Sequence, residues 1–432
     1  MRTRPAFRPA LLLAFGLCFS LAPLAVAQVR ARDAAGLDRE TQAQAVLDLL
    51  GPEHVLREAW RVTTGAFYDK SRLPADWEQA RERYQERLDG ARTPEAVHAV
   101  VNEMLGLTRT SHLALIERRV FLREVDNEFR NRLVVRAGCE LEEVEGRLFV
   151  CGVTEGGPAA EAGLLGGDEV VAIDGRAPAA SGRLDPAGHD PALGGGPYWF
   201  LRPDDPPREI ALEVRRERGG ATFALGLLPR PTSQIASVRA SARVEPVAGK
   251  QVAVIHLWHY MHSGVVDALD EALAGPFAAA DALVLDVRGR GGSSLVVSAV
   301  LARFDGPRAK WRKPVVVLTD RGTRSAKEIF AWEWKRRQRG PIVGERTAGA
   351  CVGCTFRQLS DGSILALPVQ DVTRLTRGED LEGKGVEPTE PVAQLPLPWR
   401  AGQDAILAAG LTRAATLAEA PAAPARPAAE SF

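Results

Sequence analysis

Short apolar runs alternate with helical periodicity along the second half of this 432-residue chain. Short runs bounded by Gly and Pro predict buried strands, whereas apolar residues recurring every three or four positions predict helices. Such alternation predicts an α/β core, here spanning residues 233–412. Its expected strands are 252–257, 282–287, 314–319 and 341–344, and its expected helices are 265–273, 295–304 and 328–337.

The pattern changes towards the N-terminus. Apolar residues at helical spacing predict a helical region over residues 28–119. Residues 120–232 instead show short strand patterns separated by Gly- and Pro-containing turns, and residues 177–207 are interpreted as an insertion in this β-rich part. The fold class is therefore α/β and multidomain. The helical segments expected near the N-terminus are 43–50, 55–67, 77–88 and 94–105.

Both ends of the chain are interpreted as lying outside the folded part. Three arginines precede an apolar run that ends in a small-x-small pattern at Ala27, so residues 1–27 are predicted to be a cleaved signal peptide. A retained membrane anchor is the alternative, although Pro23 interrupts the run. Residues 413–432 are rich in Ala and Pro and are predicted to be a disordered tail. We therefore expect an exported protein, periplasmic or secreted.

Composition argues against several classes of partner. The whole chain has 55 basic and 55 acidic residues, and loss of residues 1–27 leaves 52 basic ones. No polybasic stripe indicates nucleic acid, and no other segment predicts stable membrane insertion. His256, His259 and His262 have a spacing that suggests a metal site, but residues three apart on a strand do not share a face. No metal or cofactor is expected.

The most informative segment surrounds Ser325. This residue follows an expected strand and precedes an expected helix, which predicts an exposed hydroxyl on a sharp turn beside free N–H groups. The sequence from Ser325 to Phe330 resembles the active-site segment of the tail-specific, or C-terminal processing, serine peptidases. Residues 342–349 and 381–388 resemble two later segments of that family. The resemblance implies a crotonase-like core that acts on polypeptides without a cofactor.

One position departs from the family's pattern. Most of these peptidases use a Ser–Lys dyad, but this chain has Ala350 where the lysine is expected. Ser111 and His112 instead resemble the Ser-His motif of the tricorn-core branch, where histidine is the base and a distant glutamate completes the site. The resemblance implies that Ser325 is the nucleophile and His112 the general base, while Glu382 polarises Ser111.

The oxyanion would be stabilised by backbone N–H groups. Residues 286–292 resemble the family's Asp-x-Arg-x-Asn-Gly-Gly motif, with Arg290 in place of the asparagine. Gly291 or Gly292, together with Ala326, are the candidate donors. A tight turn without a catalytic part is the alternative interpretation of the glycines.

The β-rich part resembles a PDZ domain inserted into the peptidase. The resemblance rests on residues 156–164 and 167–175, a helix start followed by a strand and a turn. It implies that a loop captures a chain terminus with its N–H groups while the peptide adds as a β-strand. The residues that correspond to this loop are Gly138, Cys139, Glu140 and Leu141.

Four cysteines remain after residue 27. Cys139 and Cys151 flank an expected hairpin centred near Glu145, so export and cross-strand alignment predict a disulfide between them. Cys351 and Cys354 form a CxxC pair that could be bridged or reduced. A thioredoxin-like redox site is a third interpretation, but the sequence around the pair lacks the context of that fold.

Together these features predict an exported serine endopeptidase that cleaves unfolded or tail-exposed proteins through an acyl-enzyme. Lys327 and Lys384 are alternative bases, although Lys327 is expected to point away on its helix. The alternative function is an inactive PDZ-containing scaffold that holds peptides without cutting them. The missing lysine favours this alternative, and the intact serine, histidine and glutamate oppose it.

Overall fold

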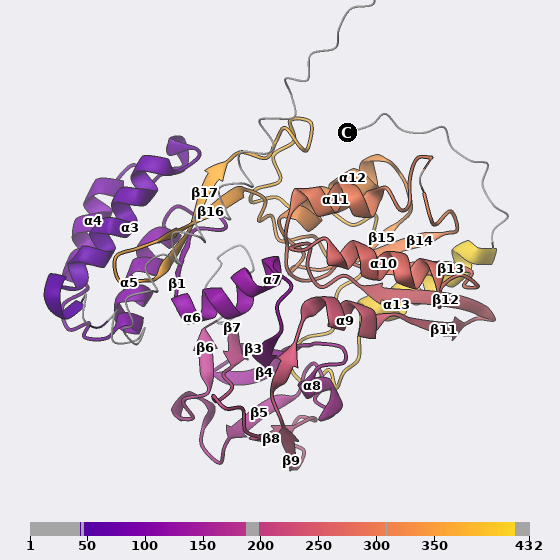
Figure 1. Cartoon of the computed structure of the whole chain (residues 1–432), viewed down its shortest axis with the longest axis horizontal. Helices are drawn as coiled ribbons and strands as arrows, with labels where there is room; N and C mark the ends of the chain where they lie inside the picture. The colour runs from indigo at the N-terminus through magenta and orange to yellow at the C-terminus, as the bar shows by residue number, and fades with distance from the viewer. Residues whose placement is uncertain (1–43, 45–46, 187–197, 308, 420–432) are drawn as a thin grey trace, which may run out of the picture. The chain divides into compact units, whose positions relative to one another are not determined.

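The computed structural model describes residues 44, 47–186, 198–307 and 309–419, so the predicted signal peptide lies outside the described part (Figure 1). None of the helices in these ranges is long and apolar enough to span a bilayer. The chain divides into two compact units, each considered by itself. The first comprises Met1–Thr108, His112–Arg118 and Gly353–Gln370, and the second comprises Arg109–Ser111, Arg119–Val352 and Asp371–Phe432.

The first unit packs helices against a three-stranded antiparallel sheet of order β1-β17-β16. The helix that begins at Pro94 starts as its sequence predicts, because the Thr93 hydroxyl accepts a hydrogen bond from the Ala96 N–H. Residues 353–370, which the sequence pattern placed in the α/β core, instead share an apolar cluster with these helices. The elements are α3 (Pro52–Ala66), η2 (Lys70–Arg72), α4 (Trp77–Glu86), α5 (Pro94–Gly106), β1 (Ala114–Ile116), β16 (Gly353–Gln358) and β17 (Ile364–Gln370).

The second unit contains a six-stranded sheet of order β11-β12-β13-β14-β15-β18, parallel except for β11. Every strand and helix expected in the α/β core is present within a few residues of its predicted bounds. The strands are β11 (Arg243–Val247), β12 (Lys250–His256), β13 (Ala282–Asp286), β14 (Val315–Thr319), β15 (Ile342–Gly344) and β18 (Glu390–Pro391), and the helices are α9 (Gln234–Ser241), α10 (Gly264–Ala274), α11 (Ser294–Leu301), α12 (Ala326–Arg336) and α13 (Ala405–Glu419).

Alternate residues of the central strands face two different apolar layers. Leu283 and Leu285 of β13 pack with residues of α10, α11 and α12, which Figure 1 shows gathered along one side of the sheet. Val284 packs instead with Ile406 and Ala414 of α13. Since successive strand residues point to opposite faces, a strand covered on both faces needs a continuous apolar run. Parallel pairing also brings the carboxyl ends of β12, β13 and β14 to one edge, where ligands bind in such sheets.

A seven-stranded antiparallel sheet of order β6-β7-β3-β4-β5-β8-β9 forms the β-rich part. The two strands of the β3–β4 hairpin are joined at Glu145 and Gly146, whose positive φ angles of 52° and 72° fit a tight two-residue turn. The elements of this part are α6 (Arg118–Phe121), η3 (Leu122–Asp126), α7 (Asn127–Phe129), β2 (Val134–Arg136), β3 (Cys139–Val144), β4 (Arg147–Val153), α8 (Pro158–Glu161), β5 (Glu169–Ile173), η4 (Pro178–Ala180), β6 (Leu184–Pro186), β7 (Tyr198–Leu201), β8 (Ile210–Arg215), β9 (Thr222–Leu227) and β10 (Arg230–Thr232).

The register of this hairpin corrects the predicted disulfide. Cys139 lies opposite Val153 rather than Cys151, because the turn and a bulge next to Glu140 shift the pairing by two residues. Both thiols are free, and burial raises the pKa of Cys139 to about 12. The prediction that the two cysteines face each other is therefore wrong.

Helix α13 corrects the predicted tail. It runs from Ala405 to Glu419, so the first residues of the segment expected to be disordered are helical. Ala414 and Ala415 are buried against the six-stranded sheet. Small side chains at helical spacing let this helix approach the strands closely, which an Ala-rich composition alone does not reveal. Residues 420–432 lie outside the described part.

Candidate active site

Ser325 occupies a strained turn between β14 and α12. Its φ and ψ angles are 58° and −124°, a conformation that non-glycine residues rarely adopt. Two hydrogen bonds hold the turn in this conformation. The Ser325 N–H donates to the carbonyl oxygen of Ala350 at 2.9 Å and to Oε2 of Glu328 at 3.0 Å. A serine presented in this way at the end of a buried strand has the geometry of a nucleophile elbow.

Ala350 lies beside the candidate nucleophile, as expected for the position that holds the lysine in related enzymes. It is fully buried, and its own N–H donates to Oε2 of Glu328 at 2.8 Å. Alanine has no group that can accept a proton. Any base for Ser325 must therefore come from another position.

Glu328 ties the serine turn to the following loop. Besides the N–H groups of Ser325 and Ala350, its carboxylate accepts hydrogen bonds from the Gly349 N–H and the Thr347 hydroxyl, each at 2.7 Å. Burial raises the pKa of Glu328, and these donors act in the opposite direction. The side chain thus accepts from four donors, and among the described residues only the Ser325 N–H keeps another acceptor, the Ala350 carbonyl, once the carboxylate is removed.

Replacing Glu328 by Ala should destabilise the protein by at least about 3 kcal/mol, because several buried donors lose their acceptor. Chemical denaturation of the purified variant measures this. Glu271→Ala is the matched control, since this exposed carboxylate only pairs with Arg239 at the surface and should cost under about 1 kcal/mol. Equal stabilities for the two variants contradict the structural role given to Glu328.

The glycine turn after β13 approaches the nucleophile closely. A Cβ added to Gly291 would lie 2.5 Å from Cβ of Ser325 and 3.2 Å from its Oγ, so only glycine fits there. Among the described residues, none accepts a hydrogen bond from the N–H of Gly291 or Gly292. Ala326 is the first residue of α12, where the N–H has no intrahelical acceptor. The N–H groups of the three candidate oxyanion donors thus have no acceptor among the described residues, and Gly291 lies next to the Ser325 side chain.

The structure brings Ser111 and Glu382 together. Oε1 of Glu382 accepts from the Ser111 N–H at 2.7 Å, and Oε2 accepts from the Ser111 hydroxyl at 2.9 Å. Oε2 also accepts from the N–H of Cys351, the residue after Ala350. The glutamate thus links the segment that precedes His112 to the loop that supports the nucleophile. His112 itself opens a segment of the first unit with a left-handed φ of 59°, and its role as base stays a prediction.

Lys327 does not point away from the site, contrary to expectation. It is fully buried, and its Nζ donates to the carbonyl oxygens of Trp258 and Arg288, each at 2.8 Å. The reason is that the first turn of α12, residues 326–329, is buried on every side, so the lysine has no exposed face of the helix to occupy. Burial lowers the pKa of Lys327 to about 7. Lys384, the other candidate lysine, is exposed.

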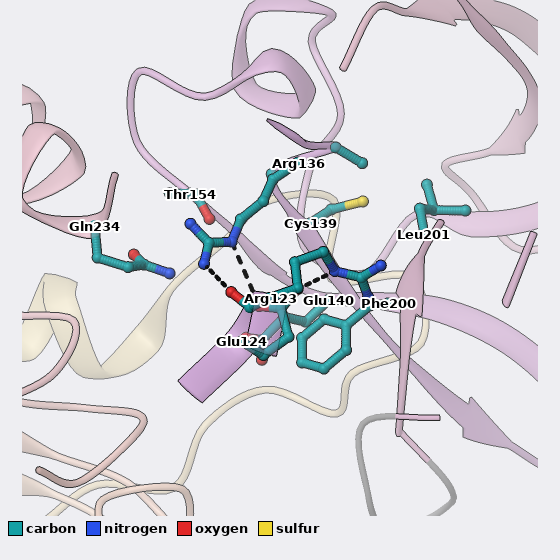
Figure 2. A pocket seen from close by; sticks show the side chains of 11 residues that line it. Arg123, Glu124, Arg136, Cys139, Glu140, Thr154, Phe200, Leu201 and Gln234 are labelled. Atoms are coloured by element: carbon teal, nitrogen blue, oxygen red, sulfur yellow. Dashed lines mark hydrogen bonds and ion pairs between the residues drawn. The ribbon is translucent and has the colours of Figure 1, made fainter. Parts of the chain in front are cut away.

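The strand edge expected to receive a peptide is occupied by the chain itself. Glu140 and Leu141 of β3 pair with Phe200 and Trp199 of β7, a strand within the predicted insertion. Because β4 pairs on the other side of β3, a peptide can add there only by displacing β7. Figure 2 shows Glu140 and Phe200 lining a small pocket with Arg123, Glu124 and Arg136, among others.

Arg290 connects this strand pair to the glycine turn. Its guanidinium forms an ion pair with Glu140 and lies 4.8 Å from the ring centroid of Phe200. The residue that replaces the family's asparagine therefore joins the turn before Gly291 to β3 and β7. Sequence reasoning missed this contact, because nothing in the pattern of residues 177–207 indicated a partner for β3.

The spaced histidines have structural partners. Nδ1 of His256 lies 3.2 Å from Glu155, and Nε2 of His259 lies 3.0 Å from Glu128. Within the described ranges, His, Cys, Asp and Glu side chains form no group of three that could hold a metal ion. Cys351 and Cys354 of the CxxC pair form no disulfide with each other.

Comparison with known proteins gives two family matches. Residues 296–392 match Peptidase family S41, and residues 52–106 match the tricorn protease C1 domain. Tricorn protease homolog 2 of Streptomyces coelicolor is 26% identical over 395 residues, which cover 81% of this chain and 31% of the homolog. The chloroplastic C-terminal processing peptidase of Tetradesmus obliquus is 28% identical over 366 residues, 77% of this chain and 75% of the peptidase.

The chain thus spans about a third of the length of the first relative and three quarters of the second. A crystal structure of a CPAF mutant matches with a TM-score of 0.51 and 12% identity, covering 85% of this chain and 98% of that one, which shows a shared fold. Both family matches agree with the motifs around Ser325 and with the helices before Ser111. Residues 296–392 therefore match the model of Peptidase family S41, and the chain is similar over most of its length to carboxyl-terminal processing and tricorn proteases.

Proposed function

We propose that this protein is an exported serine endopeptidase that cleaves unfolded or tail-exposed proteins with Ser325 as nucleophile. His112 removes the Ser325 proton as the hydroxyl attacks the peptide carbonyl, and the oxyanion is stabilised by N–H groups of Gly291 or Gly292 and Ala326. The amine leaves after protonation by the same histidine, and water releases the acyl-enzyme. Glu382 orients His112 through Ser111.

The observation that carries this proposal is the set of unused N–H groups around a strained serine. Strain at Ser325 is maintained by Glu328 and by the Ala350 carbonyl, and such strain persists only where surrounding contacts impose it. The contact between Glu382 and Ser111 supports the histidine assignment, because it joins the two segments that the tricorn-core pattern requires. Export rests on residues 1–27 alone.

Labelling with a serine-directed fluorophosphonate tests the function. We expect a single adduct at Ser325, located by peptide mass mapping, together with cleavage of an unfolded protein by the same preparation. The Ser325→Ala variant should neither label nor cleave. A folded wild-type protein that does neither contradicts the proposed activity.

The second candidate function, a scaffold that holds peptides without cutting them, is favoured by Ala350 alone. Its expected binding edge is already paired with β7, which removes the open strand that a PDZ-type scaffold offers. We therefore assign the PDZ-like part of residues 120–232 a supporting role beside the peptidase core. One of its contacts with the glycine turn beside Ser325 is the ion pair of Arg290 with Glu140.

The pH dependence of kcat/KM should show a rising limb with an apparent pKa of about 6–7.5, because a histidine base must be deprotonated to work. Burial gives Lys327 a pKa of about 7, so the wild-type profile alone does not separate the two residues. The Lys327→Met variant should keep the limb. A limb that disappears in Lys327→Met contradicts His112 as the base.

A further inference from the structure

Lys327 is a buried amine that forms no ion pair with the described residues. Its ammonium contacts two neutral carbonyl oxygens, those of Trp258 and Arg288, and lies 5.7 Å from the ring centroid of Tyr260. Taking an ammonium out of water is costly unless its protons are well used. Replacing a buried charged group by a hydrophobic residue of similar size is often neutral or stabilising. The presence of lysine here indicates a purpose other than stability.

The two carbonyls belong to two neighbouring turns, one of which carries the candidate oxyanion donors Gly291 and Gly292. One turn follows β12 and contains Trp258 and Tyr260, and the other follows β13 and contains Arg288 and Gly291. The turns also touch through Tyr260, whose N–H donates to the Gly291 carbonyl at 2.8 Å and whose carbonyl accepts from the Ser293 N–H at 2.8 Å. Lys327 adds a second cross-link between the two turns, because its amine donates to Trp258 in one turn and to Arg288, which precedes Gly291, in the other.

The direction of the glycine N–H groups depends on these carbonyl contacts. Because a peptide group is planar and trans, fixing the Gly291 carbonyl on Tyr260 fixes the opposite direction of the Gly292 N–H. Gly289, Gly291 and Gly292 carry no side chain that could anchor the turn by packing. The approach of Gly291 to Ser325 leaves no space even for a methyl group. A small displacement of the turn therefore changes how the donors meet an oxyanion.

We propose that Lys327 is a positioning residue that holds the 286–292 turn, through the Arg288 and Trp258 carbonyls, in the place where its glycine N–H groups stabilise the oxyanion formed at Ser325. The inference rests on the proposed peptidase function. Burial lowers the pKa of Lys327 to about 7; Asp286 and Asp320 oppose the shift, whereas Arg290 and Arg288 add to it. The protonated amine has three N–H donors and the neutral amine has two, so either form can donate to both carbonyls. The cross-link therefore does not require a charge on Lys327.

The test compares Lys327→Met with Lys335→Met in the full chain. Lys335 lies on the same helix and also donates to a backbone carbonyl, that of Glu387 at 2.8 Å, but it is remote from the glycine turn. We expect kcat of Lys327→Met to fall about 10²-fold while KM changes less than about threefold, since oxyanion contacts act in the transition state. Its thermal stability should be unchanged or higher. Lys335→Met should retain wild-type kcat.

Hydrogen exchange provides a readout that does not depend on activity. Amide exchange of the segment 286–293 should become faster in Lys327→Met and stay unchanged in Lys335→Met. Unchanged exchange and unchanged kcat overturn the proposal. A loss of kcat without faster exchange also overturns it, because Lys327 would then act on the reaction directly. If Lys327→Met does not fold, Lys327→Gln keeps an N–H donor with shorter reach and should show intermediate effects in both measurements.

An inactive wild-type protein contradicts the proposed function but leaves the positioning of the turn open to the exchange experiment. Faster exchange in Lys327→Met then still supports the structural cross-link without the catalytic part. In that case the catalytic half of the proposal is rejected with the peptidase activity. The two failures are therefore distinguishable.

Discussion

Replacing Ser325 by Ala should abolish peptide hydrolysis, and replacing His112 by Ala should lower kcat/KM nearly as much. We expect losses of about 10⁴-fold or more for each, because nucleophile and base act as a unit. For the same reason the double variant should be little worse than either single one. Steady-state cleavage of an unfolded protein measures the complete reaction. The rate of fluorophosphonate labelling measures the reactivity of the Ser325 hydroxyl alone.

His98→Ala is a control for the histidine. His98 lies in the first unit like His112, and its Nε2 is 2.8 Å from Asp361 in a buried contact that belongs to the helical part. Its loss should reduce stability and leave kcat unchanged. Full activity in a folded His112→Ala variant removes histidine from the mechanism and leaves Lys327 as the base to be tested.

The elements that the sequence predicts well are those whose signal is local. Continuous apolar runs identified β12, β13 and β14, because these strands are covered on both faces and need such runs. The serine turn was predictable from the strand before it and the helix after it. The contact between Ser111 and Glu382 followed from family motifs rather than from spacing, since the two residues are 271 positions apart.

The features that the sequence did not predict depend on contacts between distant segments. Pairing of β1 with β17 moves residues 353–370 into the helical unit, and no periodicity in that hairpin indicates its partner. The pairing of β7 with β3 lies within a Gly- and Pro-rich stretch that resembles a loop in composition. Lys327 was expected outside because lysine is almost never buried without a partner, and its carbonyl acceptors come from turns 39 and 69 positions away.

Replacing Glu382 by Gln should lower kcat/KM by about 10²- to 10⁴-fold, the range expected when the group that orients a catalytic histidine is neutralised. Oε1 of Glu382 serves the Ser111 N–H, while Oε2 serves the Ser111 hydroxyl and the Cys351 N–H. An amide keeps one acceptor oxygen, so in either orientation its NH₂ group faces at least one donor. Ser111 then loses its fixed position, and His112, which follows it, loses its orientation.

Glu387→Gln is the matched control, because this glutamate lies on the same segment but forms an exposed ion pair with Arg346. It should leave kcat unchanged. The kcat/KM of Ser111→Ala should lie between those of the two glutamate variants. In Ser111→Ala, Glu382 still accepts from the backbone N–H of residue 111 but no longer accepts from a hydroxyl. A Glu382→Gln variant with wild-type kcat and an unchanged pH profile contradicts the relay from glutamate through Ser111 to His112, and would leave Glu382 a structural link between two loops.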